Sequence, residues 1–304
     1  MGFFESLIGR QRTETGAPTH QRGPTAVTRP SMPVFALEVV GLPPCWLVSA
    51  AITDVGLVRS NNEDNVRLLQ DPEIGVSLAL LADGMGGHAS GEVASDLALE
   101  AVIEGFRQKD PHETLSSVLV KTFDQANHHV WQHAQTHPET SGMGTTLCAL
   151  AFDRELGVHL CWVGDSRIYL LHEGALQQLT RDDTLVNHLL ENGLLTPEQA
   201  QNHPDAHVLS QALGTHDSLR KANSLRLENP VAMGDVFLLT SDGVHDVLSL
   251  ESMCRILMEE DTYLAAQSLI EAAKVSGSTD NLSAVVVRAS VHKNWHTQQS
   301  LTRP

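Results

Sequence analysis

Basic residues are scarce in this chain of 304 residues. Its 20 Lys and Arg residues stand against 37 Asp and Glu residues, which gives a formal net charge of −17. Surfaces that bind nucleic acids or anionic membranes depend on clustered basic side chains. The composition therefore argues against both kinds of partner, and we expect no contact with nucleic acid. Bound metal cations would neutralise part of the acidic excess.

Cysteine and long apolar runs are also in short supply. Cys45, Cys148, Cys161 and Cys254 include no Cys-x-x-Cys pair, so the spacing suggests neither a zinc site nor a thioredoxin-like motif. Free thiols fit a reducing compartment. No apolar run approaches the roughly 20 residues of a membrane-spanning helix, and the N-terminus lacks the apolar core of a signal peptide. We therefore expect a cytoplasmic protein with no transmembrane segment.

Common nucleotide-binding and nucleophile motifs are missing as well. Residues 84–87 lack the Rossmann glycine spacing, and residues 163–168 lack the second glycine of a nucleophile elbow. His129, His133 and His137 recur every four residues near an expected helix end, where solvated side chains are a simpler interpretation than a metal site. These absences leave carboxylates as the main candidates for chemistry.

The apolar pattern indicates one α+β domain between less regular ends. A hydrophobic content of 41% is enough for a sizeable core. We assign residues 1–45 to a flexible N-terminal extension, residues 46–290 to the folded domain and residues 291–304 to a C-terminal tail. Within the domain, residues 181–214 look like a short helical excursion from the core.

Strands and helices come in separate runs along the folded domain. Apolar recurrence predicts helices at residues 91–106 and 114–134, and two more within 250–273. The predicted strands are residues 47–53, 65–69, 76–82, 145–152, 158–163, 167–171, 175–179, 224–227, 235–240 and 282–288. Short connections predict antiparallel pairing. This organisation is typical of antiparallel sheets that pack together with helix pairs on the outside.

Aspartates recur at the ends of apolar runs that we interpret as buried strands. They are Asp83, Asp165, Asp242 and Asp280. A single Asp-Gly after a strand is usually only a turn, but a repeated pattern is difficult to assign to chance. A carboxylate at a buried strand end is costly unless positive charge meets it. With Glu63 and Asp64, these residues predict a site for a pair of hard divalent cations.

Carboxylate-rich sites without histidine suit Mg²⁺ or Mn²⁺. Two such ions about 3.5–4 Å apart, bridged by a carboxylate and a water, generate a hydroxide for in-line attack on phosphorus. Asp83, at the tightest turn, is the expected bridge. Arg59, close to Glu63 and Asp64, could bind a phosphoryl group bidentately. Taken without its neighbours, Arg59 would be interpreted as a solvated surface residue.

The chain from about residue 49 to residue 288 resembles the bacterial metal-dependent protein serine/threonine phosphatases, the PPM or type 2C phosphatases. The motifs that carry the resemblance are residues 53–65, 82–88, 141–146, 163–167, 239–246 and 279–281, in the family's order. The resemblance implies a four-layer α-β-β-α sandwich, in which two antiparallel sheets are flanked by helix pairs and metal ions bind in the cleft between the sheets. It also implies that residues 181–214 form a small flap subdomain beside the cleft.

The resemblance further implies a role for individual residues. Asp83, Asp242 and Asp280 would hold one ion, and Glu63, Asp83 and the carbonyl of Gly84 would hold the other. The remaining assignments are Asp64 in the same acidic shell, Arg59 on the substrate phosphate, and Asp165 with Asp242 and Asp246 at a third, weaker metal site.

Two features depart from the family pattern. Many eukaryotic members have a histidine directly after the Asp-Gly pair, where this chain has Met85. His88 is not given that role merely because it is nearby. The usual Asp-His-Ser opening of the flap is Asp-Asp-Thr at residues 182–184.

We therefore expect a Mn²⁺- or Mg²⁺-dependent hydrolase of phosphoserine and phosphothreonine that uses a metal-bridging hydroxide. Its substrates would be phosphorylated proteins, and its setting the reversal of a bacterial Ser/Thr kinase. Two alternatives stay open. One is a catalytically weak regulatory module that binds phosphoproteins, against which the complete acidic set and Arg59 argue. The other is a phosphatase for small phosphoesters, because metal ions and Arg59 recognise only the phosphoryl group.

Overall fold

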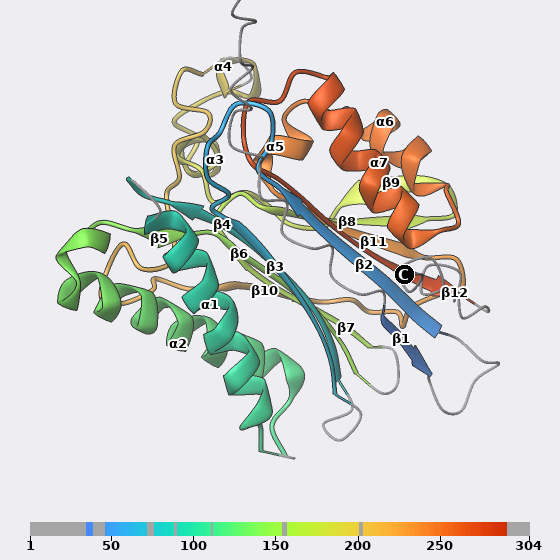
Figure 1. Cartoon of the computed structure of the whole chain (residues 1–304), viewed down its shortest axis with the longest axis horizontal. Helices are drawn as coiled ribbons and strands as arrows, with labels where there is room; N and C mark the ends of the chain where they lie inside the picture. Colours follow the sequence, from blue (N-terminus) through green and yellow to red (C-terminus); the bar gives the residue numbers. More distant parts are fainter. Residues whose placement is uncertain are drawn as a thin grey trace, which may run out of the picture.

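The structure, a computed structural model, describes residues 35–38, 46–71, 76–87, 90–110, 112–153, 157–200 and 203–290. Two sheets pack face to face, and helices cover both outer surfaces (Figure 1). The strand pairings within both sheets are antiparallel. The expected four-layer α-β-β-α sandwich is therefore confirmed.

The first sheet has the strand order β1-β2-β12-β11-β8-β9. Its strands are β1 (Phe35–Glu38), β2 (Trp46–Asp54), β8 (Arg167–His172), β9 (Ala175–Gln178), β11 (Val236–Thr240) and β12 (Leu282–Ser290). The central strand β11 is buried at every position, because sheet and helices cover it on both faces.

The second sheet has the order β10-β7-β6-β4-β3, with β5 paired to β4. Its strands are β3 (Asp64–Asp71), β4 (Val76–Met85), β5 (Gly144–Thr145), β6 (Leu147–Phe152), β7 (Val158–Val163) and β10 (Asn223–Arg226). β6 is a fully buried continuous apolar run, and β7 is fully buried and apolar except for His159. Their inner side chains meet those of the first sheet and form the core between the sheets.

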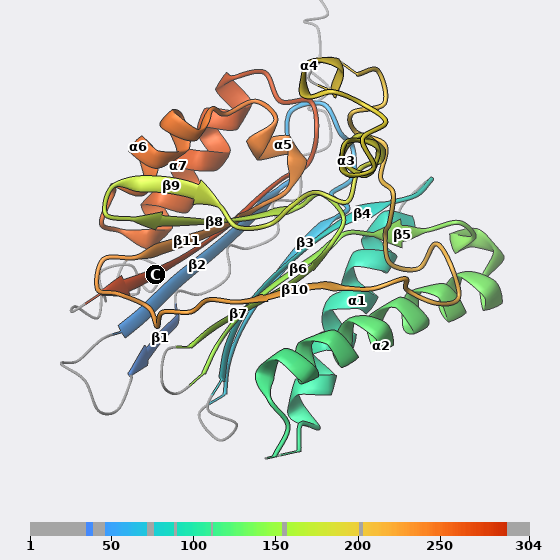
Figure 2. The same cartoon turned by 180° about the vertical axis from the view of Figure 1, so that it is seen from behind.

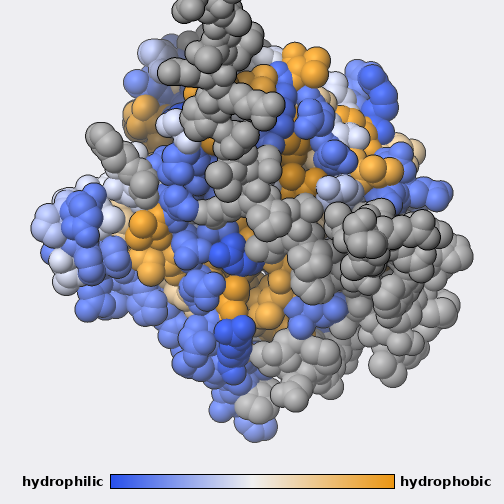
Figure 3. Space-filling view, viewed as in Figure 1, coloured by the Kyte–Doolittle hydropathy of each residue, from blue (hydrophilic) through white to orange (hydrophobic). Residues whose placement is uncertain are grey.

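The helices that cover the sheets bury one face each. They are α1 (Ser90–Arg107) and α2 (Leu115–Thr136) on the second sheet, and α5 (Asp242–His245), α6 (Leu250–Leu257) and α7 (Thr262–Val275) on the first. The remaining helices are the short η1 (Pro138–Thr140), and α3 (Leu185–Glu191) and α4 (Pro197–Ala200) in the excursion, of which α4 buries no residue. On the face seen in Figure 3, hydrophilic side chains cover much of the described surface around α1 and α2. Both helices thus show the predicted amphipathic pattern.

The excursion lies beyond one end of the sandwich. Figures 1 and 2 both show α3 and α4 at the end where β4 reaches β5, on the side of α5. Strands of both sheets bring their terminal carboxylates to this end of the sandwich.

Several features differ from the prediction. β1 lies within the segment assigned to the N-terminal extension, and it pairs with β2. The helical residues of α5, which begin at Asp242, were not predicted. Cys148 and Cys161 are free and buried and Cys254 is free, as expected, whereas Cys45 lies outside the described residues. No helix in the described part of the chain combines the length and apolar character that a membrane crossing needs.

Candidate active site

A cleft of about 550 Å³ opens between the strand ends and the excursion. The expected site residues that line it are Arg59, Glu63, Asp83, Gly84, Asp165, Asp242 and Asp280. Asp64 and Asp246 do not line it. Met85, the departure from the family pattern, does. His88 lies outside the described residues. Residues distant in sequence are thus brought together by the strand ends.

The backbone of Asp83 is fixed by its neighbours in the sheet. Its N–H donates to the Oγ1 atom of Thr146 at 3.0 Å. Its carbonyl accepts from the Thr146 N–H at 2.9 Å and from the Thr145 hydroxyl at 2.9 Å. With both backbone groups hydrogen-bonded, the end of β4 holds the carboxylate in a constant position relative to the cleft. The motif containing these threonines was predicted, but their role was not.

Glu63 lies close to the first turn of α1 because two glycines at this contact, Gly84 and Gly91, have no side chain. The N–H of Gly84 donates to the Glu63 carbonyl at 3.2 Å. A Cβ at Gly84 would lie 2.0 Å from the carbonyl oxygen of Gly91, and one at Gly91 would lie 2.8 Å from Glu63 Cδ. Only glycines permit this contact between β4, the 55–63 loop and α1. Burial raises the pKa of Glu63, while a hydrogen bond from the Gly91 backbone lowers it.

Asp64 lies behind the cleft, between the two sheets. It is only 1% exposed, and it sits opposite Asp83 in the register of β3 and β4. The Ser241 hydroxyl donates to its carboxylate at 2.7 Å and accepts from the Ser283 N–H at 3.0 Å. Burial raises the pKa of Asp64 to about 7, and the negative charges of Asp242 and Asp280 add to the shift. Asp64 therefore contributes charge to the site without reaching its surface.

Burial and neighbouring negative charges raise the pKa of Asp83, Asp165 and Asp242 in the cleft. For Asp83, burial is the largest cause, and the charges of Asp64, Asp242 and Asp165 follow; its pKa lies well above the ordinary value. Burial and the charge of Asp242 raise the pKa of Asp165 to about 7. Burial and the charges of Asp280 and Asp246 raise the pKa of Asp242, against the lowering effect of hydrogen bonds to the Gly243 backbone and the Asp83 side chain. Such uncompensated carboxylates, with no histidine among the expected ligands, fit a hard divalent cation.

Asn281 connects the loop before β3 to the last strand, and sequence reasoning missed its role. Its Oδ1 atom accepts from the Glu63 N–H at 2.9 Å. Its Nδ2 atom donates to the carbonyls of Val55 at 2.9 Å and Asn61 at 2.8 Å. One amide side chain thus holds the segment that carries Arg59 and Glu63 against the segment that carries Asp280.

Asp280 and Asp246 are turned toward cationic or titratable side chains. Asp280 accepts from Arg59 at 2.6 Å. Asp246 lies 3.5 Å from His207 Nδ1 and 3.9 Å from His245 Nε2. Within the part of the chain that the structure describes, no three His, Cys, Asp or Glu side chains meet as a closed ligand set. His207 belongs to the excursion, which forms the other cleft wall with Leu209, Ser210, Gln211 and Ala212.

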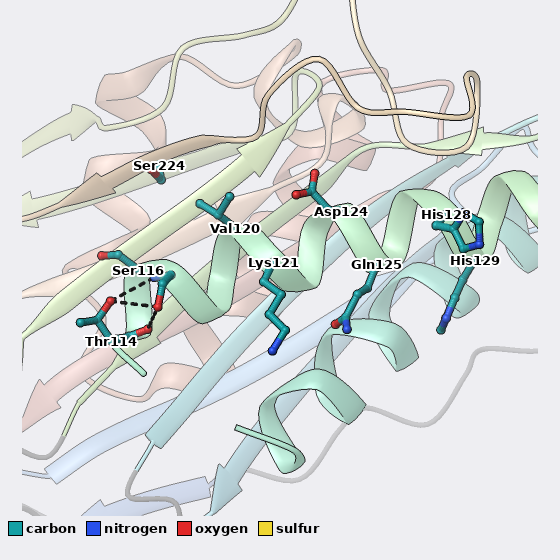
Figure 4. A pocket seen from close by; sticks show the side chains of 10 residues that line it. Thr114, Ser116, Val120, Lys121, Asp124, Gln125, His128, His129 and Ser224 are labelled. Carbon is teal, nitrogen blue, oxygen red and sulfur yellow. Dashed lines mark hydrogen bonds between the residues drawn. The ribbon is translucent and has the colours of Figure 1, made fainter. Parts of the chain in front are cut away.

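A larger hollow of about 840 Å³ lies elsewhere, along the outer side of α2 (Figure 4). Its lining includes Asp124, Lys121 and His128, and the side chains labelled in Figure 4 are spread along the helix, except for Ser224 on β10. Asp124 is its only carboxylate among the lining residues. Size alone would favour this hollow, but it brings no set of carboxylates together. The acidic cleft is therefore the candidate active site.

Comparison with known proteins adds independent information. The family model for protein phosphatase 2C matches residues 58–287. The serine/threonine protein phosphatase PstP of Mycobacterium tuberculosis is 38% identical over 258 residues, which cover 83% of this chain and 47% of PstP. The serine/threonine phosphatase stp of Listeria monocytogenes is 34% identical over 239 residues, covering 77% of this chain and 93% of that protein. This chain thus spans about half the length of PstP.

Solved structures give the same match. The crystal structure of the M. tuberculosis serine/threonine phosphatase PstP/Ppp has a TM-score of 0.71 at 37% identity, covering 80% of this chain and 99% of that one. The PstP catalytic domain in complex with 2 manganese ions has a TM-score of 0.69 at 36% identity, covering 81% of this chain and 99% of that one.

Proposed function

This chain belongs to the protein phosphatase 2C family, and we propose that its acidic cleft removes phosphate from phosphoserine and phosphothreonine in proteins. The observation that carries the proposal is the convergence of Glu63, Asp83, Asp242 and Asp280 on the cleft that Arg59 also lines. The relatives named as serine/threonine phosphatases support it, and so does the solved relative that holds manganese.

The donor set of the cleft suits two Mn²⁺ or Mg²⁺ ions. Asp83, Asp242 and Asp280 would hold one, and Glu63, Asp83 and the Gly84 carbonyl would hold the other. Such ions, when bound, activate water for attack and polarise the phosphoryl group. A third, weaker site would use Asp165, Asp242 and Asp246.

The protein's own groups would bind and orient the substrate. Arg59 presents a guanidinium that can donate two parallel hydrogen bonds to phosphoryl oxygens. Its hydrogen bond to Asp280 limits the directions that the remaining N–H groups can take. Met85 lines the cleft and cannot donate a proton to the leaving alcohol. Residues 181–214 would act as the flap that borders the cleft and contacts the protein substrate.

Phosphorylated proteins, produced by a cognate Ser/Thr kinase, are the proposed substrates. The test is phosphate release from a phosphothreonine peptide with added Mn²⁺ by the wild type, Asp242→Asn and Asp124→Asn. The last variant removes one carboxylate from the hollow along α2, outside the cleft. We expect turnover that Asp242→Asn abolishes and Asp124→Asn retains. Absence of turnover by folded, manganese-supplied wild type, on this peptide or on p-nitrophenyl phosphate, would reject the enzyme and favour the binding module.

A further inference from the structure

A second, polar cavity of about 210 Å³ adjoins the acidic cleft on the side of the excursion. Ser210 and Gln211 line both the cavity and the cleft, so a single wall separates them. Arg220 and Lys221 line the cavity on the segment that leads to β10. A peptide whose phosphorylated residue occupies the cleft could therefore extend over this wall and bring a neighbouring side chain to the cavity.

Hydrogen bonds fix the two cationic residues relative to that wall. The Nη2 atom of Arg220 donates to the carbonyl of Ser210 at 2.6 Å. The Nε2 atom of Gln211 donates to the carbonyl of Lys221 at 3.0 Å. Ser210 is anchored in turn, because its N–H donates to the carbonyl of Asp183 at 2.7 Å. The side chain of Arg220 and the backbone of Lys221 are thus tied to the rim of the cleft.

The carboxylates that line the cavity already have partners. Asp182 accepts from Arg167 at 2.7 Å, and Glu191 accepts from Arg181 at 2.6 Å. Asp183 accepts from a backbone N–H at 3.0 Å and from an amide side chain at 3.0 Å. Burial raises the pKa of Asp183, while these hydrogen bonds and the charge of nearby Arg220 lower it. These contacts leave little acceptor capacity facing the cavity.

Arg220 and Lys221 keep most of their donor capacity. Both are exposed, and neither forms a salt bridge within 4.0 Å to another residue of the described part of the chain. Arg220 uses one N–H on Ser210 and has four more, and Lys221 has three. In a chain of net charge −17, two adjacent cations beside an acidic cleft are an exception to the general charge.

We propose that Arg220 and Lys221 form a specificity subsite for an anionic side chain that lies close in sequence to the phosphorylated residue of the substrate. The anion is a carboxylate or a second phosphate, since both present oxygens to a guanidinium and an ammonium. The inference rests on the proposed function, because it concerns substrates of the same cleft.

The test compares phosphothreonine peptides that carry one variable residue. This residue is glutamate, glutamine, lysine or a non-hydrolysable phosphonate analogue of phosphoserine. In successive peptide sets, it is placed at each position on either side of the phosphothreonine. We expect the wild type to prefer glutamate over glutamine by about fivefold in kcat/KM at the best position, the size of effect that exposed charge contacts supply. The preference resides in KM and decreases as salt rises. If the phosphonate peptide raises kcat/KM over the glutamine peptide by more than the glutamate peptide does, phosphate is the favoured anion.

The double variant Arg220→Ala/Lys221→Ala should lose this preference. The matched control is Lys109→Ala/Arg226→Ala, which also removes one lysine and one arginine, at residues that line neither the cleft nor the cavity. We expect the control to keep the preference, which excludes a general effect of net charge. If the wild type cleaves all peptides with equal kcat/KM, or if both double variants behave alike, the subsite is wrong while the phosphatase stands. If the wild type cleaves neither the peptides nor p-nitrophenyl phosphate, the subsite and the phosphatase activity are both rejected.

Discussion

The guanidinium of Arg59 donates a 2.6 Å hydrogen bond from Nη2 to the Oδ2 atom of Asp280, 221 residues further along the chain. Both residues line the acidic cleft. The Arg59 side chain is nevertheless 52% exposed, so further N–H groups remain accessible to a ligand. The cation proposed to bind phosphate and a carboxylate proposed to bind metal are therefore held side by side, and either can orient the other.

This pair predicts a graded loss in variants of Arg59. Arg59→Lys keeps the charge but loses the bidentate fork, and we expect kcat/KM for a phosphothreonine peptide to fall about 10-fold. Arg59→Ala loses both the charge and the fork, and we expect kcat/KM to fall about 100-fold, which is equivalent to the loss of one or two charged hydrogen bonds. Steady-state kinetics with Mn²⁺ measure both. Arg255→Ala, an exposed arginine on α6, is the control. Equal effects of the Lys and Ala variants would show that the fork is unimportant.

The close contact between Gly84 of β4 and Gly91 of α1 leads to a prediction about stability. In Gly91→Ala, the new Cβ would lie 2.7 Å from the carbonyl carbon of Gly84 and 2.8 Å from Glu63 Cδ. We expect the free energy of unfolding to fall by about 1–3 kcal/mol, the usual cost of overpacking. Gly87→Ala is the control, because a Cβ there meets nothing within 4 Å. Urea unfolding measures both, and a Gly91 variant as stable as the control would contradict the proposed tight contact.

Asn281 offers a separate test of how the cleft is assembled. Asn281→Ala removes the acceptor of the Glu63 N–H and the donor to the carbonyls of Val55 and Asn61. At about 1 kcal/mol for each lost hydrogen bond, unfolding should become easier by about 3 kcal/mol. Turnover should fall too, since Glu63 loses its position. Asn192→Ala should change little, because within the described residues the Asn192 side chain bonds only to His188, one helical turn away. Normal stability and kcat in Asn281→Ala would show that the loop is held by other contacts.

Much of the fold and of the acidic set was predictable because the signals are local. The largely apolar strands β6, β7 and β11 are buried at every position, as near-continuous apolar runs of this kind indicate. Carboxylates placed directly after such runs had to arrive at strand ends, and the antiparallel pairing brought them together. The residues lining the cleft therefore include most of those named from sequence.

Features that depend on distant partners were not predictable in this way. β1 has only four residues, and its pairing with β2 rather than its composition makes it a strand. The bonds of Asn281 span 218 to 226 residues, so no spacing in the sequence announces them. The burial of Asp64 depends on Ser241, which is 177 residues away. The position of His207 next to Asp246 likewise depends on how the excursion folds back.

The raised pKa of Asp64 predicts how stability changes with pH when EDTA removes metal. Its pKa moves from 3.8 to about 7, so the folded state binds this proton more tightly than the unfolded state does. The contribution is fully present below pH 3.8 and is lost as pH rises through about 7. Its full size is on the order of a few kcal/mol. Asp64→Asn should be more stable than the wild type at pH 8 and similar at low pH.

Urea unfolding of the EDTA-treated protein at pH 5 and pH 8 measures this difference. Asp217→Asn, at an exposed position, should follow the wild-type dependence on pH. If Asp64→Asn showed the same loss of stability between the two pH values as the wild type, the charge of Asp64 would not be its source.

Metal binding should reverse the loss of folding stability at high pH, because ions bind the folded cleft and require ionised carboxylates. Mn²⁺ at about 100 times its Kd stabilises the folded state by about 2.7 kcal/mol, so the wild-type Tm should rise on addition and fall again with EDTA. The rise should be larger at pH 8 than at pH 5, since burial and neighbouring charges raise the pKa of the proposed ligands Asp83 and Asp242, so that protons compete with the metal more strongly at the lower pH. Asp242→Asn should lose most of the rise and Asp124→Asn none, as differential scanning fluorimetry can show. An undiminished rise in Asp242→Asn would place the metal elsewhere and remove the basis for the two-ion cleft.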